Sequence, residues 1–448
     1  MMKSILVASL GLFLAAPIYA APPAKAKPAP KTVAVSPRQK VFDIVWRTVR
    51  DSHYDPKLNG VNWVAARAKY LPQALKAKDD AAFYAVLNAL LGELKQSHLG
   101  AIPPAALKAA QTTGTNTAPA TGRGSGETGI TAQWIDGVPV VVRVQPNSAG
   151  ADAGVKPGFV VTAINDKPLL PVIQTTLSAT PNRRAGEERV TVWALLSALL
   201  SGIRETPYML AVTDNSGAAQ TLTITPRKPT GETITFGALP PITADIETRT
   251  LAGGVGYVRF SIFLIPVSEP VKDAIRGFAA AKASAIIIDL RGNRGGVGVM
   301  ASGIAGTLLA KETSIGTMRT RASTLTFTAY PQDPVYTGRV VILTDEGSIS
   351  TSEIMAAGLQ EAGRATVIGR QTAGMVLPSQ IVTLPDGGRL QFVFADFKTP
   401  KGTFLEGRGV TPDVEIPLTR ETLAASTSGD PVLDAALTYL NQKETVKP

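Results

Sequence analysis

Hydrophobic residues between positions 38 and 100 recur at the spacing of an α-helix. The clearest stripe spans 83–94, where apolar side chains are mostly three or four positions apart, and an acidic pair at 79–80 offers an N-cap. His98 falls one step further along this stripe, just before Gly100, which we expect to end the helix. The pattern predicts a helical N-terminal domain over 38–100.

Short strand-forming runs bounded by turn residues follow over 128–228. A short helix framed by turns at 146–158 separates the first two of these runs. The pattern predicts a β-rich domain with strands at 138–144, 160–164, 208–213 and 220–225.

This order of elements resembles a PDZ module of the circularly permuted bacterial kind, in which the edge of a strand captures peptide ends. The resemblance is good across 140–170. It is poor at Phe159, where such modules usually carry an acid, and an insertion at 171–200 departs from their usual length. The resemblance implies that a peptide carboxylate binds a loop formed by Thr128, Gly129 and Ile130.

Buried apolar runs alternate with helical patterns over the remaining chain, from 229 to 448. This alternation predicts an α/β layer with catalytic turns at the ends of strands. Segment 379–417 has the pattern of a hairpin around 386–388 followed by a final strand. The expected strands lie at 255–260, 285–290 and 339–343, and the expected helices at 267–283, 297–310 and 351–362.

The start of the chain has the three parts of a secretory signal peptide. Residues 1–20 comprise a charged start, an apolar run at 5–16 and a small residue at Ala20, and an Ala-, Pro- and Lys-rich linker follows at 21–37. We expect a periplasmic or secreted protein with no stable membrane span after cleavage; an uncleaved anchor is the alternative. A second flexible linker is expected at 101–127.

Composition excludes several classes of function. The 448 residues are enough for about three domains. There is no cysteine, which excludes thiolate catalysis, disulfides and zinc sites built on cysteine. The net charge is +10, but four lysines lie before residue 38 and the remaining excess is not clustered, which argues against nucleic-acid binding.

A turn rich in hydroxyl residues separates a buried strand from a helix within 340–354. A serine at such a junction is exposed beside the free N–H groups of the helix start, which suit an oxyanion. The alternative is that Ser348, Ser350 or Thr351 only caps the helix, with Glu353 next in line.

A second buried strand runs into a glycine-rich turn over 286–296. Missing side chains let backbone N–H groups approach a ligand closely. A phosphate cradle is the competing interpretation, but the P-loop lysine is absent, and a plain turn stays possible. We expect Asp289 and Arg291 to brace the turn rather than to contact substrate.

Four motifs in order are similar to those of the tail-specific, or C-terminal-processing, serine peptidases. The resemblance implies an α/β multidomain protein: a helical N-terminal domain, a PDZ-like β-rich domain and a protease domain of the ClpP/crotonase type. The motifs are Asp-Leu-Arg-Gly-Asn-x-Gly-Gly at 289–296, Gly-Ser-x-Ser-x-Ser-Glu-Ile at 347–354, Gly-Arg-Ala-x-Val-Ile-Gly at 363–369 and Glu-Gly-Arg-Gly-Val-x-Pro-Asp at 406–413.

The resemblance implies that Ser350 is the nucleophile and that N–H groups of Thr351 and of Gly295 or Gly296 form the oxyanion hole. The well-known members activate this serine with a lysine, but Met375 stands at the corresponding position. Methionine cannot take a proton, and a serine hydroxyl needs a base to react at neutral pH.

His98 is the candidate base. The Ser97-His98 pair looks like that of the tricorn-core branch, in which a histidine from the N-terminal helical region and a glutamate complete the site, and Glu406 matches that glutamate. Imidazole, with an ordinary pKa near ~6.5, accepts a proton at neutral pH. The alternative for His98 is a role in the core or as a helix cap. The alternative for Glu406 is that it is only an exposed acid in a loop. His53, the other histidine, has no motif partner and is expected at the surface or in packing.

These observations favour an exported serine endopeptidase that acts on peptides or on unfolded C-terminal segments of proteins and needs no metal or organic cofactor. Enoyl-thioester hydration on the same scaffold is disfavoured, because the enzymes that catalyse it lack the serine-rich helix start. A catalytically inactive peptide-binding protein remains the rival, and it is correct if His98 lies far from Ser350. The oligomeric state is left open.

Overall fold

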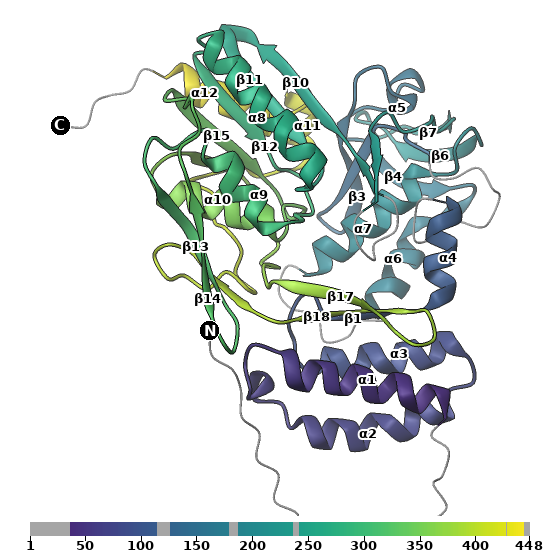
Figure 1. Cartoon of the computed structure of the whole chain (residues 1–448). Helices are drawn as coiled ribbons and strands as arrows, with labels where there is room; N and C mark the ends of the chain where they lie inside the picture. The colour runs from purple at the N-terminus through teal and green to yellow at the C-terminus, as the bar shows by residue number, and fades with distance from the viewer. Residues whose placement is uncertain (1–35, 114–125, 179–186, 236–241, 427, 443–448) are drawn as a thin grey trace, which may run out of the picture. The chain divides into compact units, whose positions relative to one another are not determined.

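The structure is a computed structural model that describes residues 36–113, 126–178, 187–235, 242–426 and 428–442 (Figure 1). The expected signal peptide and nearly all of the linker at 21–37 lie outside the described residues. No helix in these described ranges is long and apolar enough to cross a membrane.

Three helices pack together around the N-terminal core that the apolar stripe predicts. Asp79 caps the third helix, and its side chain accepts a hydrogen bond of 2.7 Å from the N–H of Ala82. Buried aromatic and aliphatic side chains such as Phe42, Trp63 and Leu87 fill the space between the helices. The helices are α1 (Pro37–Ser52), α2 (Trp63–Lys76) and α3 (Asp80–Gly92), with a short 3-10 turn η1 (Leu58–Gly60).

The expectation that His98 continues the helical stripe is wrong. Helix α3 ends at Gly92, and the next N–H groups, up to Lys95, bond three residues back, which tightens the chain into turns. Lys95 and His98 then have left-handed φ angles of 52° and 57°. His98 therefore lies on a turn beyond the helix.

The predicted linker at 101–127 also differs, because its first part is ordered. Strand β1 (Gly100–Ile102) pairs antiparallel with β18 (Arg389–Val393), and helix α4 (Pro104–Thr113) follows. β18 is half of the predicted hairpin and pairs with β17 (Ser379–Thr383). Residues 114–125 lie outside the described residues.

Residues 128–228 contain a six-stranded antiparallel sheet, in which the short strand β5 pairs only with β4, and helices pack against this sheet. The order β2-β3-β4-β6-β7 leaves β2 at one edge, and helix α7 packs beside it. Three predicted strands match and the fourth is displaced by one residue. The elements are β2 (Ile130–Ile135), β3 (Val138–Val144), α5 (Ala149–Asp152), β4 (Val160–Ile164), β5 (Lys167–Pro168), α6 (Leu169–Ser178), α7 (Glu187–Ser201), β6 (Tyr208–Thr213) and β7 (Ala219–Ile224).

A six-stranded sheet of order β10-β11-β12-β15-β16-β20 forms the centre of the C-terminal region (Figure 1). All neighbours are parallel except β10 and β11. The sheet strands are β10 (Ile246–Leu251), β11 (Val255–Phe260), β12 (Ala285–Asp289), β15 (Arg339–Thr344), β16 (Thr366–Gly369) and β20 (Val414–Glu415).

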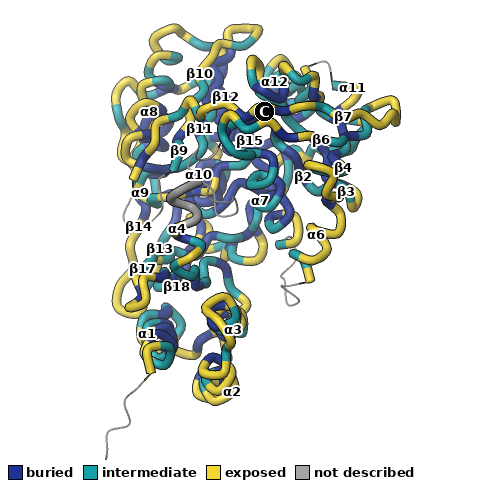
Figure 2. Tube along the Cα trace, turned by 90° about the vertical axis from the view of Figure 1, so that its right-hand side faces the viewer, coloured by how far each residue is buried: buried dark blue, intermediate teal, exposed yellow. Residues whose placement is uncertain are grey.

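Both faces of this sheet are covered, which explains its continuous apolar strands. Alternate residues Ile286 and Ile288 pack toward helices α8, α9 and α10, whereas Ile287 packs toward α12. Strand β15 and helix α10 are buried along almost their whole length (Figure 2). The helices are α8 (Ile265–Ala280), α9 (Gly298–Ala305), α10 (Thr351–Glu361) and α12 (Pro431–Asn441).

The remaining elements lie around this core. They are β8 (Glu232–Ile234), β9 (Ile242–Ala244), η2 (Ala252–Gly254), β13 (Thr313–Arg319), β14 (Thr324–Ala329), β19 (Asp396–Lys398) and α11 (Arg420–Ala425).

The register of the sheet positions the candidate site. Parallel neighbours β12 and β15 pair Asp289 with Leu343, so both strands end at the same edge. The glycine turn after β12 and the serine turn after β15 must therefore meet there.

Candidate active site

The two turns touch at Ser350. Ser350 stands at the N-cap of α10 with φ 59° and ψ −115°, a conformation that non-glycine residues adopt rarely and mostly at functional sites. A Cβ atom at position 295 would lie 2.7 Å from Ser350 Cβ, so only glycine fits there. The glycine turn thus approaches the candidate nucleophile directly.

The contacts distinguish the two glycines proposed for the oxyanion hole. The N–H of Gly295 donates to Asn293 Oδ1 at 2.9 Å and is therefore occupied. Within the part of the chain that the structure describes, no acceptor is seen for the N–H of Gly296 or Thr351. The Thr351 hydroxyl donates to the Gly296 carbonyl at 2.9 Å and ties these two residues together.

The neighbouring serines have structural roles. Ser348 Oγ donates to the carbonyl of Leu290 at 2.8 Å, and Ser352 Oγ donates to that of Asn293 at 2.8 Å. Both hydroxyls therefore fasten the serine turn to the glycine turn. Of the three serines in the motif, Ser350 is the half-buried one that water or a substrate can reach.

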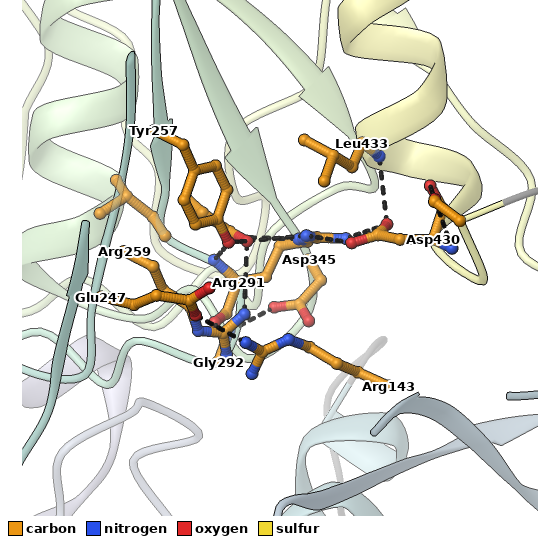
Figure 3. A network of polar contacts seen from close by, with 12 residues as sticks. Arg143, Glu247, Tyr257, Arg259, Arg291, Gly292, Asp345, Asp430 and Leu433 are labelled. Carbon is orange, nitrogen blue, oxygen red and sulfur yellow. Dashed lines mark hydrogen bonds and ion pairs between the residues drawn. The ribbon is translucent and has the colours of Figure 1, made fainter. Parts of the chain in front are cut away.

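A buried ionic network braces the glycine turn, as expected for Asp289 and Arg291. Asp289 accepts 2.7 Å bonds from Tyr257 and Arg291, and Arg291 also pairs with Asp430 at 2.7 Å (Figure 3). Burial alone would raise the pKa of Asp289, but Arg291 and Arg259 outweigh it and hold that pKa well below its usual range. The network stays charged and fixes the start of the turn.

Asp345 couples the two turns to each other. Its Oδ1 accepts 2.9 Å bonds from the N–H groups of Gly292 and Gly347, one from each turn. Its Oδ2 accepts a 2.7 Å bond from Gln133 of the β-rich sheet.

Glu353 is a functional candidate that the sequence pattern indicates only as part of a helix cap. The fully buried carboxylate accepts bonds from the N–H groups of Ser350 (3.1 Å), Gly374 (2.8 Å) and Met375 (2.9 Å) and from the hydroxyl of Thr372 (2.6 Å). Burial raises the pKa of Glu353 to about 7, although these four bonds oppose the rise. The sequence signal for this carboxylate is its spacing of three residues after Ser350.

Ser97, His98 and Glu406 form a bonded cluster. Ser97 donates its N–H to Glu406 Oε1 at 2.7 Å and its hydroxyl to Oε2 at 2.9 Å, and Ser97 Oγ lies 2.8 Å from His98 Nδ1. An ionised carboxylate only accepts, so the single hydroxyl proton goes to Glu406. Nδ1 must then carry the proton donated to Ser97, which makes Nε2 the basic nitrogen of the half-buried ring.

Two consecutive residues join this cluster to Ser350. Val376 donates its N–H to Glu406 Oε2 at 3.1 Å, and the carbonyl of Met375 accepts the N–H of Ser350 at 3.0 Å. The segment that lacks the family lysine thus connects Glu406 with Ser350 through its backbone. The Met375 side chain packs near Trp193 and Ile349.

The loop proposed to bind a peptide carboxylate lies apart from these contacts. Thr128 is buried, its hydroxyl donates to Leu200 at 3.1 Å, and its carbonyl accepts the N–H of Gly150 at 2.8 Å. Gly129 has φ 70°, and Ile130 packs into the core of the β-rich sheet. No described group of His, Asp or Glu residues is arranged to hold a metal ion.

Comparisons with known proteins support the motif assignment. The model of peptidase family S41 matches residues 254–416, and that of the tricorn protease C1 domain matches 36–92. The carboxyl-terminal-processing protease of Synechocystis sp. is 26% identical over 405 residues, covering 87% of this chain and 84% of that protein. A second such protease, from Picosynechococcus sp., is 25% identical and covers 94% and 93%.

Solved structures agree on the fold. The photosystem II D1 C-terminal processing protease superposes with a TM-score of 0.57 at 20% identity, covering 89% of this chain and 97% of that one. The fold class expected from the sequence is therefore confirmed. The chain is a serine-type peptidase that carries a peptidase family S41 domain at residues 254–416 and is similar over most of its length to carboxyl-terminal-processing proteases.

Proposed function

We propose that the chain is an exported endopeptidase in which Ser350 is the nucleophile and His98 the general base. The proton of Ser350 Oγ passes to His98 Nε2 as the oxygen bonds to the scissile carbonyl carbon. The imidazolium then returns this proton to the leaving amine as the C–N bond breaks. Water repeats the sequence on the acyl-enzyme, releases the carboxylate product and restores the serine.

The remaining site residues have supporting roles in this mechanism. The N–H groups of Thr351 and Gly296 receive the oxyanion, whereas Gly295 allows the close approach of the two turns. Ser97 and Glu406 hold the imidazole and stabilise its positive charge.

The observation that carries the proposal is the series of contacts that joins His98 to the backbone N–H of Ser350. It passes through Ser97, Glu406 and the backbone of 375–376, and no bond in it exceeds 3.1 Å. The orientation of these bonds leaves Nε2 basic, which is the form that a base for serine requires. The match of the tricorn protease C1 domain to residues 36–92 further supports a base from the N-terminal region.

The substrates we propose are peptides and unfolded C-terminal segments of proteins, in keeping with the names of the relatives. The β-rich region at 128–228 would act as a PDZ-like module that admits peptide ends. Its edge strand β2 and the adjacent helix α7, bridged by the 3.0 Å bond from Trp134 to Glu188, support this role. Export rests on the signal-like sequence at 1–20.

Labelling with a fluorophosphonate probe tests the mechanism. We expect the intact chain to be labelled, Ser350→Ala to be unlabelled, and His98→Ala to be labelled at least about 100-fold more slowly. Ser216→Ala, at an exposed serine between β6 and β7, is the matched control and should be labelled normally. If His98→Ala is labelled as fast as the intact chain, His98 is not the base. If the intact chain is not labelled at all, the peptide-binding alternative is favoured.

A further inference from the structure

The turn that carries the proposed base has a strained backbone. Lys95 and His98, separated by only two residues, both have left-handed φ angles, although neither is glycine. Such a conformation persists only when surrounding contacts enforce it. These contacts are therefore part of what positions the imidazole.

Three side chains from the α1–α2 connection, those of His53, Tyr54 and Asn59, hold this turn. Asn59 Nδ2 donates to the carbonyl of Leu94 at 2.8 Å. His53 Nε2 lies 2.7 Å from Gln96 Oε1, and Gln96 Nε2 donates to the hydroxyl of Tyr54 at 2.9 Å. Gln96 immediately precedes Ser97, so its amide is held one residue before the proposed catalytic pair.

The contacts define the direction of the bond from His53. An amide oxygen only accepts, so His53 Nε2 must carry the proton that it donates to Gln96. In the neutral ring His53 Nδ1 is then the acceptor and takes the N–H of Asp55 at 3.1 Å. It also lies 3.0 Å from the Asp55 carbonyl, to which it donates only in the doubly protonated ring. His53 thus has the opposite tautomer to the one that the contacts assign to His98.

His53 is itself fixed against the peptidase domain. Its side chain is fully buried and stacks on Tyr54 with ring centroids 4.7 Å apart. Arg321, in the turn between β13 and β14, donates to the carbonyls of His53 and Arg50. A cation at these carbonyls also complements the C-terminal end of α1.

We propose that His53 is a positioning residue, which acts through Gln96 to hold the turn at 94–98 so that His98 faces Ser350. The inference rests on the proposed function of His98. Glu406 anchors this turn at Ser97, and His53 anchors it at Gln96. Glu406 belongs to the C-terminal region that carries Ser350. His53 is bonded to the same region, because Arg321 donates to its carbonyl.

The test combines turnover and hydrogen exchange in four variants of the full chain. His53→Phe keeps a ring without the donor, and His53→Gln keeps an N–H near the position of Nε2. Gln96→Leu removes the partner. Trp46→Phe is the control, because it removes a buried 2.9 Å bond between α1 and α2 away from the turn.

We expect His53→Phe to lower kcat by about 10- to 100-fold with little change in KM, because the substrate site is intact and the base is displaced. His53→Gln should recover most of this loss. The double variant His53→Phe/Gln96→Leu should be no slower than Gln96→Leu alone, because the bond between His53 and Gln96 is already absent in that single variant. Trp46→Phe should lower Tm and leave kcat unchanged.

Amide hydrogen exchange of residues 93–99 gives a result that does not need turnover. Exchange there should be faster in His53→Phe and unchanged in Trp46→Phe. Unchanged kcat with a lower Tm in His53→Phe, or losses that multiply in the double variant, would overturn the positioning role. If the intact chain hydrolyses no peptide, the function of His98 fails, and unchanged exchange would then refute the anchor independently.

Discussion

At the scale of single residues, contacts assign roles that the sequence leaves open. The motif contains three serines, and the resemblance identifies Ser350. Only the structure shows that Ser348 and Ser352 bond carbonyls of the opposite turn. Gly295 and Gly296 are equivalent in the sequence, because the direction of an N–H depends on the conformation of the turn. The bond from Gly295 to Asn293 resolves that choice.

Gly295→Ala tests the close approach of the two turns. The added Cβ would lie 2.7 Å from Thr351 N and from Ser350 Cβ, so we expect kcat/KM to fall at least about 100-fold. Gly137→Ala is a matched control, because Gly137 has nearly the same φ, 78° against 81°, but no atom within 4 Å of the added Cβ. It should cost about 1 kcal/mol of stability without loss of activity. Equal activities of the two variants would show that the turns need not touch.

Glu406→Gln tests the support of the imidazole. The amide keeps the size of the side chain but removes the charge that stabilises the imidazolium and one acceptor for Ser97. We expect kcat to fall by about 100-fold while KM changes little. Glu232→Gln, at an exposed position, should not change kcat. Steady-state kinetics on a peptide substrate measure both, and a normal kcat in Glu406→Gln would rule out this role.

At the scale of elements, periodicity predicts most helices and strands but misses those that depend on distant partners. Strands 138–144, 160–164 and 255–260 match their predicted bounds. The sequence predicts a linker where β1 lies, because three residues carry no pattern and the partner strand β18 is far along the chain. The apolar stripe predicts a helix as far as His98, but α3 ends at Gly92.

Glu353→Gln tests how helix α10 is joined to the loop at 372–375. The pKa of Glu353 in the fold, about 7, exceeds its ordinary 4.5, so the folded chain binds more protons than the unfolded chain between these pH values. This residue's contribution to stability therefore falls as pH rises from 4.5 to 7, by up to about 3 kcal/mol. Glutamine does not titrate. The Tm of the intact chain relative to the variant should decrease over this range, and a constant difference would contradict the assigned pKa.

At the scale of the whole molecule, the candidate site contains residues from the N-terminal region, the β-rich sheet and the C-terminal region. Alternating apolar strands and helices predict the covered sheet, and its parallel register brings the two turns together. Nothing in the periodicity predicts that Ser97 reaches Glu406 or that Gln133 reaches Asp345. Such contacts depend on tertiary packing, and only the resemblance to a known family indicated the first of them.

Gln133→Ala tests the contact between the β-rich sheet and the site. Buried Gln133 donates to Asp345 at 2.7 Å and accepts from Arg370. Its loss leaves buried polar atoms unpaired, which should cost about 1–3 kcal/mol and lower kcat, since Asp345 holds both turns. Asn215→Ala removes an exposed hydrogen bond within the β-rich region and should change neither the stability nor kcat. Thermal unfolding and kinetics check both, and an unchanged kcat would mean that the site does not depend on this contact.

The tautomer of His98 is the most direct test of a histidine base in place of the family lysine. The chain has two histidines, so nitrogen-15 NMR of labelled protein gives two imidazole patterns, and His53→Gln assigns them. For the neutral rings, the account predicts Nδ1–H for His98 and Nε2–H for His53. A His98 ring with its proton on Nε2 would have no basic nitrogen for Ser350 and would contradict the account.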